Sequence, residues 1–158
     1  MSAAEQLLEA LIEKGMTIST AESCTGGMTA ASITDLPGAS ACFETGFITY
    51  SNAAKMRLLG VNEATLVQYG AVSEQTVREM CEGARRVSGA SIAVALTGIA
   101  GPGGGTADKP VGLVYIGVSG AQGTAAERLM FGGGRGEVRR RAAEYALEMA
   151  LRYIEQLI

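Results

Sequence analysis

The sequence has 158 residues, of which 47% are hydrophobic and 18% are charged, with a net charge of −3. This length and composition predict one soluble domain over residues 1–158 that needs neither a disulfide nor a metal for stability. The acidic balance, with a pI near 5.1, argues against nucleic-acid binding, and the lack of any run of 18 apolar residues argues against a membrane span.

Histidine is absent from the sequence. Its absence excludes Ser-His-Asp and Cys-His nucleophile systems as well as the common histidine-based metal sites. Cys24, Cys42 and Cys81 form no CxxC pair, so a zinc cage and a thioredoxin-like motif are excluded too. Three scattered thiols and an acidic N-terminus that does not resemble a signal peptide predict a cytoplasmic protein. No cofactor is expected.

The first half of the chain alternates helical and extended patterns. Ser2 and Glu5 match a capping box, and a stripe of leucine and isoleucine predicts a helix over residues 2–14. β-Branched residues then predict a first strand, and Pro37-Gly38 marks the end of the helix that follows it. After the first helix we predict, in chain order, a strand over 16–20, a helix over 28–36, a strand over 43–50, and short helices over 52–60 and 62–68.

The second half begins with a helix that Ser73 is expected to cap and that runs through residue 87. Residues 91–97 form a continuous apolar run, which is typical of a strand buried on both faces. Strands over 112–119 and 124–131 are separated by a short turn, which predicts a hairpin. A final helix should follow residues 132–136 and run through Leu157, with a core stripe of Val138, Ala142, Tyr145, Met149, Tyr153 and Leu157.

This order of elements predicts an α/β fold, a single three-layer α/β/α sandwich with a mixed, mostly parallel sheet of about five strands. Three segments directly follow candidate strands: the turn at 20–27, the segment at 50–55 and the loop after residue 97. If those strands are parallel, the three segments meet at the carboxyl edge of the sheet, where α/β proteins bind ligands.

Residues 20–27, Thr-Ala-Glu-Ser-Cys-Thr-Gly-Gly, form the predicted strand-to-helix turn. Ser23 is a candidate nucleophile, and the N–H groups of Thr25, Gly26 and Gly27 are candidate donors to an oxyanion. The alternative is a helix cap with no chemical role. Cys24 has no histidine partner and is interpreted as a small buried hydrophobe.

Lys55 is a candidate base for Ser23, because it lies one turn into a helix that follows a strand. A lysine acts as a base near neutral pH only when burial lowers its pKa by roughly two to three units. Tyr50 is a candidate for holding the amine or relaying its proton. The alternatives are a solvated lysine and an aromatic ring that only packs.

Two segments are candidate anion sites. The glycine-rich loop from Thr97 lacks a P-loop ending, so it is either a backbone nest for an anion or a flexible surface loop. Arg135 and Arg139 share one face at the positive end of the last helix, which suits a phosphate. The alternative there is a solvated charge cluster. Glu22 is an acid near these loops whose partner the sequence leaves open.

Five blocks of the sequence, in register, resemble the CinA C-terminal domain family: residues 20–27, 46–55, 70–73, 97–106 and 109–112. The resemblance implies a nicotinamide-nucleotide amidase, which hydrolyses nicotinamide mononucleotide to nicotinate mononucleotide and ammonia in pyridine nucleotide salvage. Many family members carry an extra N-terminal domain similar to molybdopterin-binding proteins, and this chain resembles the stand-alone form.

The resemblance also implies an α/β/α sandwich, a homo-oligomer, and catalysis without a metal by Ser23 as nucleophile, Lys55 as base and Tyr50 as relay. Of the arginines, Arg139 is the first choice as phosphate anchor and Arg135 the second. The other substrate-binding groups expected are Thr25, Gly26, Gly27, Asn52, Thr97, Gly98 and Gly101. Two alternatives stay open: a non-catalytic nucleotide-binding or competence-associated interaction module, and an amidase for a different nucleotide or small amide.

Overall fold

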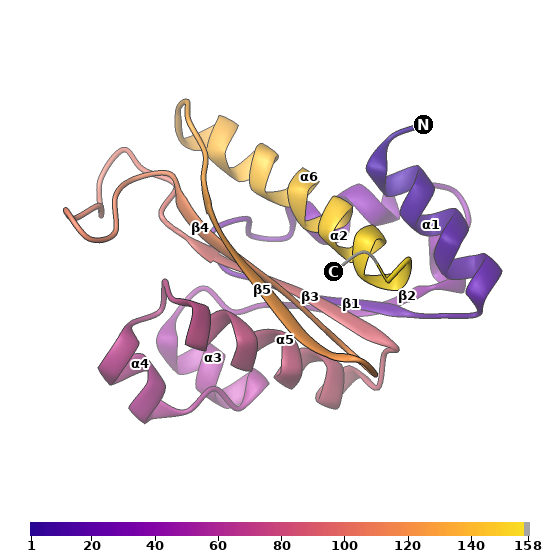
Figure 1. Cartoon of the computed structure of the whole chain (residues 1–158), viewed down its shortest axis with the longest axis horizontal. Helices are drawn as coiled ribbons and strands as arrows, with labels where there is room; N and C mark the ends of the chain where they lie inside the picture. Colours follow the sequence, from indigo (N-terminus) through magenta and orange to yellow (C-terminus); the bar gives the residue numbers. More distant parts are fainter. Residues whose placement is uncertain (157–158) are drawn as a thin grey trace.

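The computed structural model describes residues 1–156. Its strands are β1 (Ile18–Glu22), β2 (Phe43–Ile48), β3 (Ile92–Gly98), β4 (Leu113–Gly120) and β5 (Gly123–Met130). Its helices are α1 (Ala3–Lys14), α2 (Met28–Thr34), the 3₁₀ helix η1 (Ala39–Ala41), α3 (Asn52–Leu59), α4 (Glu63–Tyr69), α5 (Glu74–Ser88) and α6 (Arg135–Ile154). The sheet lies between a layer of α1, α2 and α6 and a layer of α3, α4 and α5, which confirms the predicted sandwich (Figure 1).

The strand order in the mixed sheet is β2-β1-β3-β4-β5. β1 pairs in parallel with both β2 and β3, whereas β4 is antiparallel to β3 and β5. The predicted hairpin is therefore confirmed as β4–β5. The carboxyl ends of β1, β2 and β3 meet at one edge, so the three segments that follow them are brought together there as expected.

The first strand lies two residues later than the predicted range of 16–20. Its residues Ser19, Thr20 and Glu22 are polar, yet all three are fully buried. Helix α2 covers one face of β1 and helix α5 the other (Figure 1), so its side chains are buried whatever their polarity, and this tertiary effect overrides the local pattern. As a consequence Glu22 belongs to the strand, and the turn starts at Ser23.

The hydrophobic core is divided by the sheet into two parts. The larger part packs under α1, α2 and α6, with Leu11, Ile33 and Val138 among its buried side chains. The smaller part lies toward α5 and includes Val77 and Met80. The final helix ends at Ile154, so the prediction that it runs through Leu157 is wrong: Glu155 and Gln156 already form a turn, and Leu157 itself lies outside the described residues.

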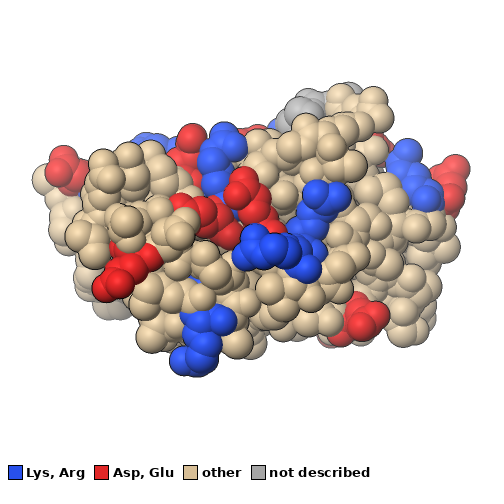
Figure 2. Space-filling view, turned by 90° about the horizontal axis from the view of Figure 1, so that it is seen from below, with Lys and Arg blue, Asp and Glu red and all other residues tan. Residues whose placement is uncertain are grey.

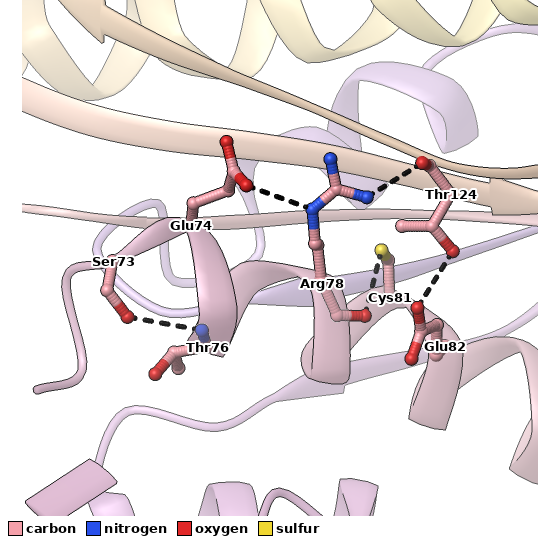
Figure 3. Close-up of polar contacts among 7 residues, drawn as sticks. All are labelled: Ser73, Glu74, Thr76, Arg78, Cys81, Glu82 and Thr124. Atoms are coloured by element: carbon pink, nitrogen blue, oxygen red, sulfur yellow. Dashed lines mark hydrogen bonds and ion pairs between the residues drawn. The ribbon is translucent and has the colours of Figure 1, made fainter. Parts of the chain in front are cut away.

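Helix α5 is attached to the hairpin by polar contacts (Figure 3). Ser73 caps the helix by accepting the Thr76 N–H at 3.1 Å, as predicted. Further along, Arg78 donates to the carbonyl of Thr124 at 2.8 Å, and the Thr124 hydroxyl donates to Glu82 at 2.9 Å. These bonds keep β5 in place at the edge of the sheet.

Acidic and basic side chains lie interspersed on the face formed by α3, α4 and α5 (Figure 2). Positive charge on this face is therefore offset locally by negative charge. Within residues 1–156, no helix is both long enough and apolar enough to cross a membrane.

Candidate active site

Ser23 directly follows β1, in a turn that leads into α2. Its N–H donates to the carbonyl of Leu96 in β3 at 3.2 Å, and its side chain is only 7% exposed. The turn then requires glycine, because Gly26 and Gly27 have φ angles of +58° and +109°. The Gly26 N–H donates back to the Ser23 carbonyl at 3.1 Å, so it is already engaged within the turn.

Lys55 belongs to helix α3, and its side chain extends to Ser23 at the carboxyl edge of the sheet. Ser51 caps α3 by accepting the Ala54 N–H at 3.0 Å, and Lys55 lies in the first turn of this helix. The Lys55 side chain is 1% exposed, and its Nζ lies 3.1 Å from Ser23 Oγ and 2.8 Å from the carbonyl oxygen of Thr49. The predicted pairing of Ser23 with Lys55 is present as a contact.

Burial lowers the pKa of Lys55 from 10.5 to about 8, while negative charge on Cys24 would act in the opposite direction. A substantial fraction of neutral amine therefore exists near pH 8. In that form one N–H can donate to Thr49, which leaves the nitrogen lone pair to accept the Ser23 hydroxyl proton. The contact therefore places a nitrogen with a lowered pKa within hydrogen-bond distance of a serine hydroxyl.

Cys24 is held in its weakly nucleophilic thiol form. It is 6% exposed, and burial raises the pKa of its thiol to about 11. The thiolate is the nucleophilic form of cysteine, so this residue is almost entirely in its unreactive form at neutral pH. The interpretation of Cys24 as a small buried residue agrees with these properties.

Arg135 connects the other two segments at the sheet edge. It is the first residue of α6, and it donates to the carbonyl of Gly101 at 2.8 Å and to the Tyr50 hydroxyl at 3.1 Å. Tyr50 is 65% exposed, and its hydroxyl faces this arginine, whereas the Lys55 amine faces Ser23 and Thr49. The proton relay by Tyr50 stays a prediction.

Arg139 lies one turn further along α6 and contacts the Ser23 turn. Its Nε donates to the carbonyl of Cys24 at 2.9 Å, and its Nη2 donates to the carbonyl of Thr25 at 3.3 Å. On the other side of the turn, the fully buried Glu22 carboxylate accepts the N–H groups of Thr29 at 2.8 Å and Ala30 at 3.1 Å. Glu22 therefore caps α2 from the neighbouring strand, which resolves the partner that the sequence left open.

Two cavities of about 230 and 240 Å³ flank Arg135 and Tyr50. One extends over Ser23, and the other is bordered by the glycine-rich loop. Several expected substrate-binding residues line them: Gly26, Gly98, Gly101, Arg135 and Arg139. The two cavities share Cys24, Tyr50 and Arg135 as lining residues, and between them they reach from Ser23 to the first residue of α6.

Other expected binding residues lie outside the lining of these two cavities. Thr25 is fully buried, and Gly27 caps α2. Asn52 is exposed at the start of α3. Thr97 is buried, and its hydroxyl donates to the carbonyl of Ala71 at 2.8 Å. Thr97 therefore holds the segment before α5 against β3.

The site also includes a backbone group that the sequence does not indicate, the carbonyl of Thr49. The carbonyl of Thr49 orients the Lys55 amine, and the Thr49 N–H donates to the Glu22 carbonyl at 2.8 Å. A backbone carbonyl carries no signal in the sequence, so only the fold identifies it. Across residues 1–156, no group of three or more His, Cys, Asp or Glu residues is placed to hold a metal ion.

The fold and the Ser23–Lys55 contact define an α/β protein with the groups that a serine–lysine hydrolase needs. The chain belongs to the CinA C-terminal domain family, whose model matches residues 1–154. The nicotinamide-nucleotide amidohydrolase PncC of Enterobacter agglomerans is 54% identical, covering 90% of this chain and 88% of that protein. The protein of the same name from Escherichia coli K12 is 51% identical, with coverages of 94% and 90%.

Longer relatives match as well. A putative competence-damage inducible protein of Symbiobacterium thermophilum is 54% identical over 91% of this chain but only 36% of its own length. Among solved structures, the competence/damage inducible protein CihA of Agrobacterium tumefaciens has a TM-score of 0.90 and 44% identity, covering 99% of this chain and 98% of that one. A CinA superfamily protein of Klebsiella pneumoniae has a TM-score of 0.94 and 34% identity, with both coverages at 99%.

Proposed function

We propose that this chain hydrolyses the carboxamide of nicotinamide mononucleotide to give nicotinate mononucleotide and ammonia. The observation that carries the proposal is the buried Lys55 amine 3.1 Å from Ser23 Oγ, in a fold that close relatives named nicotinamide-nucleotide amidohydrolases share. In a chain without histidine, this pair supplies both a nucleophile and a base.

In the first half of the reaction, neutral Lys55 accepts the Ser23 proton as Oγ attacks the carboxamide carbon. A bond forms between Oγ and carbon, and the carbonyl oxygen becomes an oxyanion. The N–H groups of Thr25 and Gly27 remain as candidate donors to it, since the Gly26 N–H is used within the turn. The C–N bond then breaks, and the departing nitrogen takes the proton from Lys55 and leaves as ammonia.

In the second half, a water molecule attacks the acyl carbon and Lys55 accepts its proton. The bond between carbon and Ser23 Oγ breaks, and the proton returns from Lys55 to Oγ. Nicotinate mononucleotide is released, and the enzyme is restored with a neutral amine. The same lysine therefore serves as base and acid in both halves.

The 5′-phosphate is held by Arg135, at the start of α6. This guanidinium is exposed and lines both cavities, and the helix N-terminus adds its own positive potential. Tyr50 lies against the same arginine and forms a wall for the ligand. This assignment reverses the order expected from the sequence, in which Arg139 was the first choice.

The direct experiment is ammonia release from nicotinamide mononucleotide by the purified protein. We expect steady turnover by the wild type and loss of nearly all of it in Ser23→Ala. Turnover by Ser23→Ala at the wild-type rate would refute Ser23 as nucleophile. No turnover by the wild type would instead favour the non-catalytic nucleotide-binding or competence-associated module, which calorimetry with the same nucleotide would detect.

An amidase for another nucleotide or small amide is tested by a substrate panel. Nicotinamide mononucleotide, nicotinamide riboside and nicotinamide are compared by kcat/KM. We expect the mononucleotide to be preferred, because only it carries the phosphate that Arg135 would contact. The homo-oligomeric assembly and the cytoplasmic location stay predictions.

A further inference from the structure

The two arginines of α6 make different kinds of contact. Arg135 donates to a loop carbonyl and to the Tyr50 hydroxyl, whereas Arg139 donates to two successive carbonyls, those of Cys24 and Thr25. The two bonds from Arg139, at 2.9 and 3.3 Å, join α6 to the segment immediately after the nucleophile across more than a hundred residues of sequence. The planar guanidinium suits such a two-point contact, because its donors have a fixed geometry.

These contacts fix the orientation of two peptide units. In a trans peptide unit the carbonyl and the N–H point in opposite directions, so a fixed carbonyl also fixes the N–H of the next residue. Arg139 therefore sets the direction of the Thr25 N–H through Cys24, and that of the Gly26 N–H through Thr25. The Gly26 N–H donates to Ser23, which closes the turn, and the Thr25 N–H stays a candidate oxyanion donor.

Opposite charges hold the turn at its two ends. The Glu22 carboxylate accepts N–H groups of Thr29 and Ala30 in α2, while Arg139 donates to carbonyls of the turn. Hydrogen bonds with one charged partner are stronger than neutral ones, so both ends are firmly held. Ser23 lies between them, and the position of its Oγ relative to Lys55 depends on the turn staying in this shape.

We propose that Arg139 is a positioning residue for the reaction, which orients the peptide units after Ser23, while the phosphate contact belongs to Arg135. This inference rests on the proposed function for its effect on catalysis. Its structural part, the hold on the turn, stands independently of the substrate. Arg139 then acts on kcat through the turn, and Arg135 acts on KM through the nucleotide.

The kinetic test compares Arg139→Gln with Arg135→Gln, and uses Arg140→Gln as the matched control because Arg140 is exposed and pairs with Glu137. For Arg139→Gln we expect kcat to fall about a hundredfold to a thousandfold, the range for a lost oxyanion donor, with KM nearly unchanged. Nicotinamide mononucleotide and nicotinamide riboside should lose rate by the same factor. Arg139→Lys should not restore the rate, because a single ammonium group does not reproduce the guanidinium fork.

A second readout needs no substrate. Cys24 is buried in the turn, so its alkylation by iodoacetamide in the folded protein reports on how firmly the turn is held. In Arg139→Gln, peptide mass spectrometry should find Cys24 labelled at least about tenfold faster, with Cys42 and Cys81 labelled as in the wild type. Arg140→Gln should leave all three rates unchanged.

The outcomes separate the two proposals. A wild type that releases no ammonia refutes the proposed function, and the labelling of Cys24 then decides the role of Arg139 alone. Unchanged Cys24 labelling in folded Arg139→Gln, together with a rise in KM for the mononucleotide but not for the riboside, would overturn the inference and make Arg139 the phosphate ligand. If Arg139→Gln fails to fold, the same labelling and kinetics on Arg139→Lys decide the question.

Discussion

The amine of Lys55 lies 3.1 Å from the hydroxyl oxygen of Ser23, and both side chains are almost entirely removed from solvent. Ser23 comes from the end of β1 and Lys55 from the first turn of α3, so the contact exists only because β1 and β2 run parallel. A lysine buried without a carboxylate partner is costly when charged, and this cost makes it a usable base.

The rate of amide hydrolysis should rise with pH through the pKa of Lys55. That pKa is lowered to about 8 by burial, so only roughly a tenth of the protein carries the neutral base at pH 7. We expect kcat/KM for nicotinamide mononucleotide to increase about tenfold for each pH unit well below 8 and to level off above it. A profile that is flat between pH 6 and pH 9 would argue against Lys55 as the base.

Stability should depend on pH through the same residue. Because burial lowers the pKa of Lys55, the unfolded chain binds more protons at this position than the folded protein between pH 8 and pH 10.5. The cost of burying the charge is fully present below pH 8 and disappears as pH rises through this window. Relative to Lys55→Met, the wild type should therefore gain about 2 to 3 kcal/mol in unfolding free energy between pH 7 and pH 10.

Urea unfolding of both proteins at the two pH values measures this gain. Lys55→Met is the control, because it keeps every titrating group of the wild type except Lys55. An equal stability difference between wild type and Lys55→Met at pH 7 and pH 10 would contradict the lowered pKa.

Glu22→Gln should destabilise the protein while keeping the size of the side chain. The carboxylate accepts two N–H groups at the start of α2, and an amide would place its own NH₂ against one of those donors. An unsatisfied buried group costs about 1–3 kcal/mol. Thermal unfolding should show this loss, while Glu144→Gln, on the surface of α6, should not differ measurably from the wild type.

Arg135→Gln should weaken binding of the phosphate-bearing substrate selectively. The KM for nicotinamide mononucleotide should rise about tenfold or more, as expected for a lost charged hydrogen bond, with kcat changed little. The KM for nicotinamide riboside should stay the same, because the riboside has no phosphate. Equal effects on both substrates would remove Arg135 from the phosphate site.

The fold was predictable from local patterns because most elements are bounded by residues with a clear physical role. Ser2 and Ser73 form the caps that their spacing predicts, and Gly15 and Gly60 end helices in the left-handed conformation. The first strand was misplaced by two residues, since Ser19, Thr20 and Glu22 are buried by the helices that cover the two faces of β1. No local pattern contains that information.

The residue patterns left the pairing of Ser23 with Lys55 open beside a helix cap and a solvated lysine, and it was the resemblance of five sequence blocks to the CinA C-terminal domain family that selected it. The contacts that surround the pair could not be predicted from the sequence. The Thr49 carbonyl, the cap that Glu22 provides to α2 and the contacts of Arg139 all depend on how distant elements pack. The two arginines share one face of α6, so helix periodicity placed them together but did not distinguish their partners.

The most direct test of the account is the rate of ammonia release from nicotinamide mononucleotide by Lys55→Met, measured beside the wild type from pH 6 to pH 10. Removal of one member of a catalytic pair typically removes most of the rate enhancement, because the two act as a unit. We predict a loss of at least about a thousandfold at pH 8 and no remaining rise with pH. A folded Lys55→Met protein that keeps its rate within about threefold of the wild type would contradict the account.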